Sequence, residues 1–184
     1  MNKWTQKRSV KQRYDITAQM YDIRYGEEQE AKYKAALAGL NVTGAVLDVG
    51  CGTGLLFSHV ATQTEAVVGV DVSGKLLLKA KERAQSFRNA HVVQADADHL
   101  PFRSACFAVV FAFTVLQNMP KPAETLTELK RAAKRNGAIV VTGLKKAFSL
   151  EAFEALLQQA GLRVVSIKAD AALKCYVAVS VQNS

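Results

Sequence analysis

Short runs of β-branched and aliphatic residues alternate with segments of helical spacing along most of this chain, from residue 45 onward. The first three runs read AVLDVG, AVVGVD and HVVQAD, and amphipathic stretches at 55–63 and 73–84 separate them. Alternation of this kind is typical of βαβ units, which build a parallel sheet covered by helices on both faces. The sequence therefore predicts an α/β fold in three layers.

The same pattern continues to the end of the chain. The runs FAVVFAF and 137–142 are the predicted fourth and fifth strands, and a helix opens between them at Pro120 and Pro122. Ser149 can cap the next helix, and Gly161 can end it. The last two strands, 162–169 and 174–181, are only four residues apart, which suits a hairpin and is too short for a parallel crossover. We expect a mostly parallel seven-stranded sheet with one antiparallel strand near its end.

The composition changes at about residue 40, although the length of the chain suits a single globular domain. Residues 1–13 carry five cations and no acid, so we expect a basic, mobile arm. Residues 14–40 mix aromatic and acidic residues at helical spacing, which predicts N-terminal helices. Residues 41–184 contain the alternating pattern and form the predicted α/β domain.

The sharpest local signal is the stretch VLDVGCGTG, which ends the first predicted strand. Its alternate glycines let the backbone turn sharply and pass close to a ligand, and we expect a helix directly after them. A dinucleotide fingerprint would need glycine in place of Leu55, and a phosphate-binding loop would need a Gly-Lys-Ser/Thr sequence that is absent here. Asp48, beside the turn, favours a ligand with a positive amino group over a pyrophosphate.

Two more acids end the neighbouring strands. Asp71 closes the second strand, where a carboxylate can accept both hydroxyl protons of a ribose, and Asp96 closes the third. The carboxyl ends of parallel strands share one edge of a sheet, which is where open α/β folds bind ligands. The acids and the glycine turn together predict a nucleoside site.

Three segments resemble, in order and in spacing, motifs I, II and III of the class I (Rossmann-like) S-adenosylmethionine (SAM)-dependent methyltransferases: VLDVGCGTG, VVGVDVS and QADADHLPF. A fourth, YDITAQMYD, is similar to the helix that closes over SAM in the methyltransferase-11 subfamily, which includes ubiquinone-pathway enzymes. The resemblance implies a Rossmann-like methyltransferase fold, SAM as the cofactor, and N-terminal helices within residues 1–40 that cover the cofactor site.

The resemblance also implies a role for individual residues. Asp48 and the backbone of the turn would hold the methionine part of SAM, and Tyr21 would lie against it; the turn residues concerned are Gly50, Cys51, Gly52 and Gly54. The ends of the next three strands would contact the ribose, the adenine edge and the region beneath the transferred methyl group. These residues are Asp71 and Val72, Asp96 and Ala97, and Ala112 and Phe113, respectively.

Catalytic residues stay unassigned. Methyl transfer from a sulfonium depends on alignment and on exclusion of water, so a dedicated base is needed only when the acceptor holds its proton tightly. Cys51, Cys106 and Cys175 are far apart and have no histidine at ligand spacing, so no metal site is predicted. The longest apolar run, 105–113, is too short to span a bilayer, and we expect a cytoplasmic protein.

Charge and loop length bear on the methyl acceptor. The formal net charge of +8 favours an anionic partner. Only residues 144–148 link the fifth strand to the next helix, which predicts an open active site. We therefore expect a macromolecular acceptor, RNA or a protein of the translation apparatus, with a small activator subunit of the zinc-binding kind that some tRNA and release-factor methyltransferases require. Two alternatives stay open: a small-molecule methyltransferase of the quinone type, and a non-catalytic SAM- or RNA-binding module.

Overall fold

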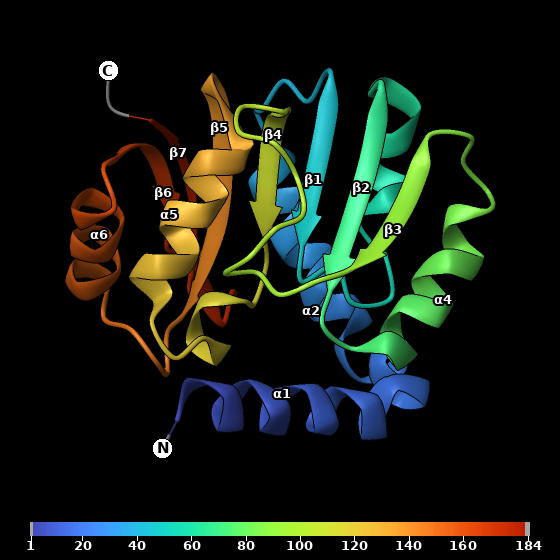
Figure 1. Ribbon diagram of the computed structural model, residues 1–184. Coiled ribbons are helices and arrows are strands. Elements are labelled where there is room, and N and C mark those ends of the chain that lie inside the picture. Colours follow the sequence, from blue (N-terminus) through green and yellow to red (C-terminus); the bar gives the residue numbers. More distant parts are fainter. Residues whose placement is uncertain (1, 183–184) are drawn as a thin grey trace.

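The computed structural model describes residues 2–182. The strands within this part of the chain are β1 (Ala45–Val49), β2 (Ala66–Asp71), β3 (Ala90–Gln94), β4 (Phe107–Ala112), β5 (Ala133–Leu144), β6 (Leu162–Lys168) and β7 (Cys175–Gln182). They form one seven-stranded sheet in the order β3-β2-β1-β4-β5-β7-β6 (Figure 1). Strand β7 runs antiparallel to both of its neighbours, and the other strand pairs are parallel. The predicted sheet, with one antiparallel strand near its end, is confirmed.

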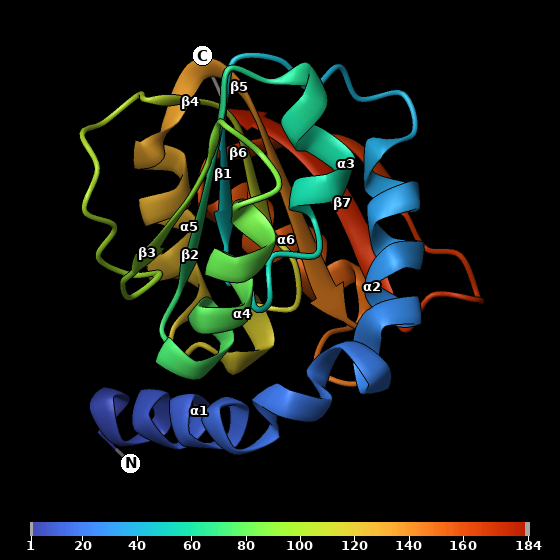
Figure 2. The ribbon, with the colours of Figure 1, turned by 90° about the vertical axis from the view of Figure 1, so that its right-hand side faces the viewer.

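Helices cover both faces of this sheet and make it the middle of three layers (Figure 2). One face carries α2 (Tyr21–Leu37), α3 (Phe57–Val60) with η2 (Ala61–Gln63), and α4 (Gly74–Ala84). The opposite face carries α5 (Pro122–Ala132) and α6 (Leu150–Gln159), and the short helix η3 (Leu116–Asn118) follows β4. The predicted three-layer architecture is confirmed.

The central strands alternate between two hydrophobic cores. Val46 and Phe111 face the core beneath α2, α3 and α4, whereas Leu47 and Val110 face the core beneath α5 and α6, and all four are 0% exposed. A strand that is buried on both faces needs an almost continuous apolar sequence, which is what the runs in β1 and β4 supply. The result is a rigid frame that fixes the loops at the carboxyl ends of the strands.

Residues near the N-terminus depart from the prediction. Helix α1 (Lys3–Thr17), joined to α2 by η1 (Ala18–Met20), runs across the carboxyl edge of the sheet (Figure 1). The residues predicted as a basic arm are helical from Lys3, and their cations meet acids on that edge: Lys3 lies 2.7 Å from a carboxylate oxygen of Glu124. The sequence shows the cations but not the acids opposite them, and residue 1 of the predicted arm lies outside the described residues.

Membrane crossing can be tested only for the helices in residues 2–182. None of them combines the length and the apolar composition that a span would need.

Candidate functional site

A cleft lies at the carboxyl ends of the strands, between the sheet and α1. Most of the predicted cofactor residues line it: Tyr21, Gly50, Gly52, Asp71, Val72, Asp96, Ala97 and Phe113. The others lie behind its wall as buried residues: Asp48, Cys51, Gly54 and Ala112. Helix α1 adds Lys7, Val10 and Tyr14 to the lining, which the prediction of an open active site did not include. The link after β5 is as short as expected, but α1 roofs the cleft.

The glycine turn after β1 has a backbone that only glycine adopts easily. Gly50, Gly52 and Gly54 have φ angles of +72°, +58° and +76°. The N–H groups of Gly50 and Cys51 donate to the carbonyl of Val70 at 2.7 and 3.0 Å, which ties the turn to β2. A Cβ at Gly50 would lie 2.5 Å from Cγ2 of Val115. The chain therefore passes the exit of β4 at a distance that excludes any side chain.

The predicted helix over 55–63 is shorter than expected. Turns occupy the stretch after Gly52, and α3 begins only at Phe57. Left-handed residues at alternate positions interrupt the α-helical backbone, so a helix cannot begin until they end. Turn hydrogen bonds already engage two N–H groups of this stretch: that of Gly54 donates to the carbonyl of Cys51, and that of Phe57 donates to the carbonyl of Gly54.

Asp71 is buried at the end of β2 and braces the turn. Its Oδ2 accepts from the N–H of Gly52 at 2.9 Å, and its Oδ1 accepts from the N–H of Ser73 at 2.8 Å. Burial raises the pKa of Asp71, and the N–H groups of Ser73 and Gly52 oppose that rise. A carboxylate has further lone pairs, so this one can hold the turn and still face the cleft.

Asp48 is 2% exposed and lacks a donor. No hydrogen-bond partner reaches its Oδ2 from residues 2–182. Burial, with the charge of Asp71 as a second cause, raises the pKa of Asp48 to about 8. A buried carboxyl that lacks a donor is costly in the charged form, and a ligand with a positive group would relieve that cost.

Helix α2 closes the cleft beside the turn. The ring of Tyr21 lies against Gly52, where an added Cβ would meet it at 3.5 Å. Gln29 donates from Nε2 to Oη of Tyr21 at 3.3 Å, while its own Oε1 is buried and finds no donor within the described chain. Sequence reasoning missed Gln29, because a glutamine in an amphipathic helix is usually solvated.

The exit of β4 is strained. Thr114 has a φ of +62°, which is unusual for a β-branched residue. Its N–H donates to Oγ1 of Thr142 at 2.7 Å, and its Oγ1 accepts from the buried ammonium of Lys32 at 2.9 Å. Asn118 donates to the carbonyl of Thr114 at 2.8 Å and to Oη of Tyr14 at 3.2 Å. Thr114, Asn118 and Tyr14 all line the cleft, and the sequence carried no signal for this arrangement.

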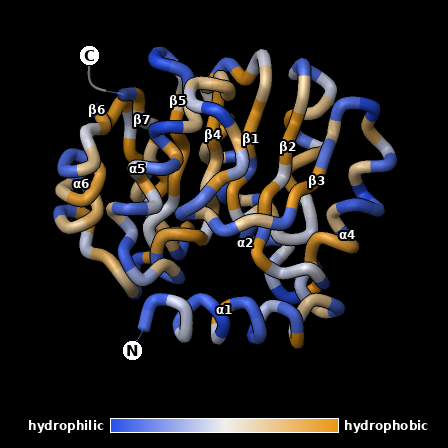
Figure 3. The backbone as a smooth tube through the Cα atoms, viewed as in Figure 1, coloured by the Kyte–Doolittle hydropathy of each residue, from blue (hydrophilic) through white to orange (hydrophobic). Residues whose placement is uncertain are grey.

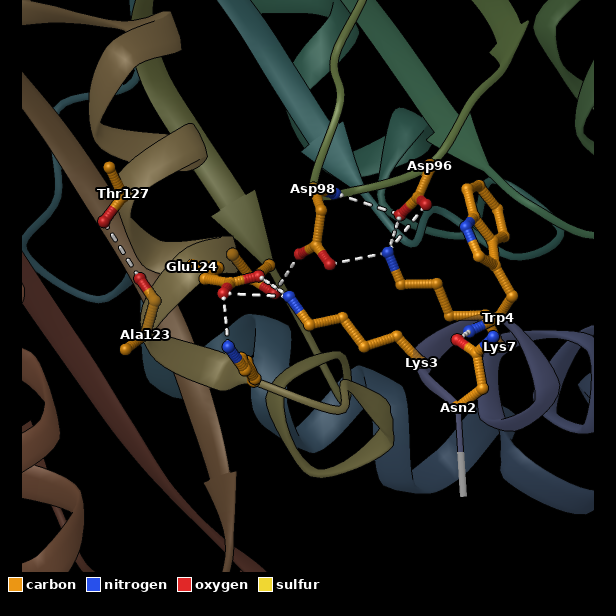
Figure 4. A network of polar contacts seen from close by, with 11 residues as sticks. Asn2, Lys3, Trp4, Lys7, Asp96, Asp98, Ala123, Glu124 and Thr127 are labelled. Carbon is orange, nitrogen blue, oxygen red and sulfur yellow. Dashed lines mark hydrogen bonds and ion pairs between the residues drawn. The ribbon is translucent and has the colours of Figure 1, made fainter.

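At the third strand, α1 reaches the acids (Figure 4). The Nζ of Lys7 lies 2.8 and 2.7 Å from the two carboxylate oxygens of Asp96 and 2.6 Å from Oδ2 of Asp98. Burial lowers the pKa of Lys7, but both carboxylates raise it and the net direction is upward. In this structure Asp96, the residue predicted for the adenine edge, is therefore paired with Lys7.

Comparison with known proteins places this fold and site in a family. The sequence profile of the "Methyltransferase domain" family matches residues 47–141, which is more than half of the chain. This chain belongs to the S-adenosylmethionine-dependent methyltransferases. The match runs from β1 to β5 and includes the glycine turn, Asp71, Asp96 and the exit of β4.

Curated relatives of this methyltransferase have different acceptors in their names. A malonyl-[acyl-carrier protein] O-methyltransferase of Marinomonas sp. is 32% identical over 144 residues, which cover 76% of this chain and 53% of the relative. A phosphatidylethanolamine N-methyltransferase of Cereibacter sphaeroides is 32% identical over 129 residues, which cover 66% of this chain and 62% of the relative. A demethylmenaquinone methyltransferase of Staphylococcus saprophyticus is 34% identical over 119 residues, which cover 62% of this chain and 51% of the relative. The aligned part of the methyltransferase spans little more than half the length of these relatives.

Solved structures share the fold of the methyltransferase. A Haloferax volcanii methyltransferase, solved in complex with the Trm112 methyltransferase activator, has a TM-score of 0.82 at 18% identity, covering 95% of this chain and 98% of that one. The magnesium protoporphyrin IX methyltransferase of Synechocystis, solved with bound SAM, has a TM-score of 0.77 at 20% identity, covering 97% of both chains. Together they confirm the Rossmann-like methyltransferase fold of this chain.

Proposed function

We propose that this methyltransferase transfers the methyl group of SAM to a small, partly apolar acceptor in the cleft between α1 and the exit of β4. The observation that carries the proposal is that α1 covers the cleft: Val10 and Tyr14 of this helix line it together with residues of the sheet edge. Apolar side chains at the exit of β4, among them Phe113, Val115 and Met119, supply the rest of that wall. A roofed, mostly apolar cleft suits a small acceptor better than a folded macromolecule.

The binding of SAM in this cleft rests on three chemical fits. Asp48, whose buried oxygen lacks a donor, suits the ammonium of the methionine part, with the backbone of the glycine turn and Tyr21 beside it. Asp71 and Val72 suit the ribose, because Asp71 is fixed at the cleft by two N–H groups. Asp96 and Ala97 suit the adenine edge, although Lys7 must first release Asp96. The N-terminal helices of residues 1–40 would then cover the cofactor.

When bound, SAM supplies a methyl group activated by a sulfonium charge. The chain's own contribution is alignment and exclusion of water, which α1, Tyr21 and Phe113 would provide from three sides of the cleft. Thr114 and Asn118 are the polar residues of the β4 exit that line the cleft. We assign them to acceptor binding and name no general base.

The names of the relatives favour an amphiphilic acceptor within this class. Two of them are methyltransferases of phosphatidylethanolamine and of demethylmenaquinone by name. We therefore place the acceptor among small lipid-like molecules.

The test is incubation of the purified protein with methyl-labelled SAM and a fractionated cell extract. We expect label in the fraction soluble in organic solvent and none in RNA or protein. Asp71→Asn, which removes one carboxylate oxygen from the proposed ribose site, is the matched inactive control. Label confined to RNA or to protein would contradict the proposal.

A macromolecular acceptor with an activator subunit is the second candidate. The net charge of +8 favours it, as does the likeness along almost the whole chain to a methyltransferase solved with the Trm112 activator. If this candidate is right, the isolated chain transfers little label, and co-expression with a small zinc-binding subunit restores transfer into RNA or protein. A non-catalytic SAM- or RNA-binding module would bind SAM and label no fraction under either condition.

A further inference from the structure

We infer that the corner where α1 turns into α2 docks on an anionic lipid membrane. Three aliphatic side chains project from this corner: Ile16, Met20 and Ile23, with exposed fractions of 73%, 56% and 79%. They follow one another at intervals of four and three residues, and one lies in each of α1, η1 and α2. We call these three residues the Ile16 ridge.

The Ile16 ridge stands out against the rest of α1. No residue of α1 is buried, and most of its backbone is coloured hydrophilic in Figure 3. A single exposed aliphatic residue is ordinary, but three on consecutive helical turns form a patch that water solvates poorly. Helix α4 lies beside this corner, because Lys79 donates to the carbonyl of Gln19 at 3.0 Å, and α4 also carries the 64% exposed Leu78.

The charged residues near the Ile16 ridge indicate which kind of partner covers it. Arg8, Arg24 and Lys75 are exposed on α1, α2 and the start of α4. The single acid of α1, Asp15, is engaged by Lys11 at 2.7 Å and by Ser73 at 2.5 Å. Glu27 is the one exposed acid on the first turns of α2, so cations dominate the corner. Aliphatic anchors surrounded by cations are the combination that binds anionic lipid headgroups.

Other occupants fit less well. Nucleic acid is held by aromatic stacking together with cations, whereas this ridge is aliphatic. A second copy of the chain would bring like charges together at the same corner. An anionic bilayer satisfies both the apolar side chains and the cations.

Docking here has a consequence for the cleft. Helix α1 is both the roof of the cleft and the carrier of Ile16, so a membrane at the corner lies next to the cleft entrance. An acceptor with an apolar tail could then pass from the bilayer to the β4 exit with little exposure to water. This consequence rests on the proposed function, whereas docking itself does not.

The experiment is vesicle flotation of the full chain without SAM. The probes are vesicles of phosphatidylglycerol and phosphatidylcholine in equal parts, and vesicles of phosphatidylcholine alone. We expect flotation with the anionic vesicles, and its loss at about 1 M salt, where the screening length falls to about 3 Å. The double variant Ile16→Ser/Ile23→Ser should lower the partition coefficient about tenfold, and Arg24→Gln should lower it about fivefold.

Matched controls lie at the far edge of the sheet, on β6. The control variants are Val165→Ser and Arg163→Gln. Val165 is 56% exposed and Arg163 is also exposed, so both variants should float like the natural chain. The inference is wrong if the natural chain does not float with anionic vesicles, or if ridge variants float as well as the controls. It is also wrong if Ile23→Ser converts a dimer to a monomer in sedimentation, or abolishes RNA binding while flotation persists.

The two proposals fail separately. The vesicles hold no methyl acceptor, so flotation reports docking alone. Intact flotation with no label in the organic-soluble fraction would overturn the proposed function and leave the membrane surface standing. Normal labelling of a lipid by a chain that does not float would do the reverse.

Discussion

Different interactions stabilise the two sides of the cleft. The sheet side, formed by the glycine turn and Asp71, is fixed by backbone hydrogen bonds and by residues that are almost wholly buried. The α1 side has no buried residue and is held by side-chain ion pairs and hydrogen bonds, chiefly those of Lys7 and Asn118. Buried backbone contacts resist local opening more than partly exposed ion pairs do. A cofactor in this cleft would therefore contact a rigid side, formed by the sheet, and a side that opens more easily, formed by α1. We call these two sides the wall and the roof.

Asp71 gives the strongest test of the rigid wall. An amide at this position has one acceptor oxygen, so Asp71→Asn can keep only one of the two N–H bonds from Gly52 and Ser73. We expect SAM binding to weaken by about 4 kcal/mol, roughly a thousandfold, because a charged acceptor and a ribose contact are both lost. Calorimetric titration measures this affinity. Asp170→Asn in the loop before β7 is the control, and equal affinities of the two variants would contradict the ribose assignment.

Gly50 tests whether the wall depends on its backbone shape. Gly50→Ala must place a side chain at φ +72° and 2.5 Å from Val115. We expect a loss of stability of about 3 kcal/mol, from the left-handed conformation and the overpacking together. Gly39→Ala is the matched control: its φ is +84°, but nothing lies within 4 Å of the added carbon, so about 1 kcal/mol should be lost. Denaturant unfolding measures both, and similar losses would mean that the approach to Val115 is not tight.

The sequence predicted the sheet side of the cleft and N-terminal helices over the cofactor site, but it did not show the contacts that hold α1 in place. The strands, the glycine turn and the acids at strand ends follow from local patterns, since apolar runs set the strands and topology brings their carboxyl ends together. Lys7 of α1 and Asp96 in the turn after β3 lie 89 positions apart in the sequence. No local pattern encodes their pairing. The left-handed Thr114 was equally hidden, because Thr142 and Lys32 hold it from distant elements.

Asp48 couples the binding of the cofactor to the release of a proton. Burial and the charge of Asp71 raise its pKa from 3.8 to about 8, which favours the protonated form at neutral pH when no cation lies beside it. If the ammonium of SAM lies against Asp48, binding lowers that pKa and releases a proton. The affinity for SAM should then rise by about 1.4 kcal/mol, or tenfold, per pH unit from about pH 6 up to that pKa. Calorimetry in buffers of different ionisation enthalpy counts the proton, and Asp48→Asn should release none; the same release from that variant would exclude Asp48 as its source.

Lys7 tests the removable roof and should give the smallest effect. Lys7 pairs with both Asp96 and Asp98 in the turn after β3, and the three side chains are 11%, 16% and 7% exposed. Lys7→Met should raise the hydrogen-exchange rates of α1 amides about fivefold, a change of about 1 kcal/mol, and leave those of β1 unchanged. Lys3→Met removes the more exposed pair with Glu124, 46% and 45% exposed, and should change exchange less than twofold. If both variants loosen β1 as much as α1, the roof and the wall open as one unit, and the contrast between the two sides of the cleft does not hold.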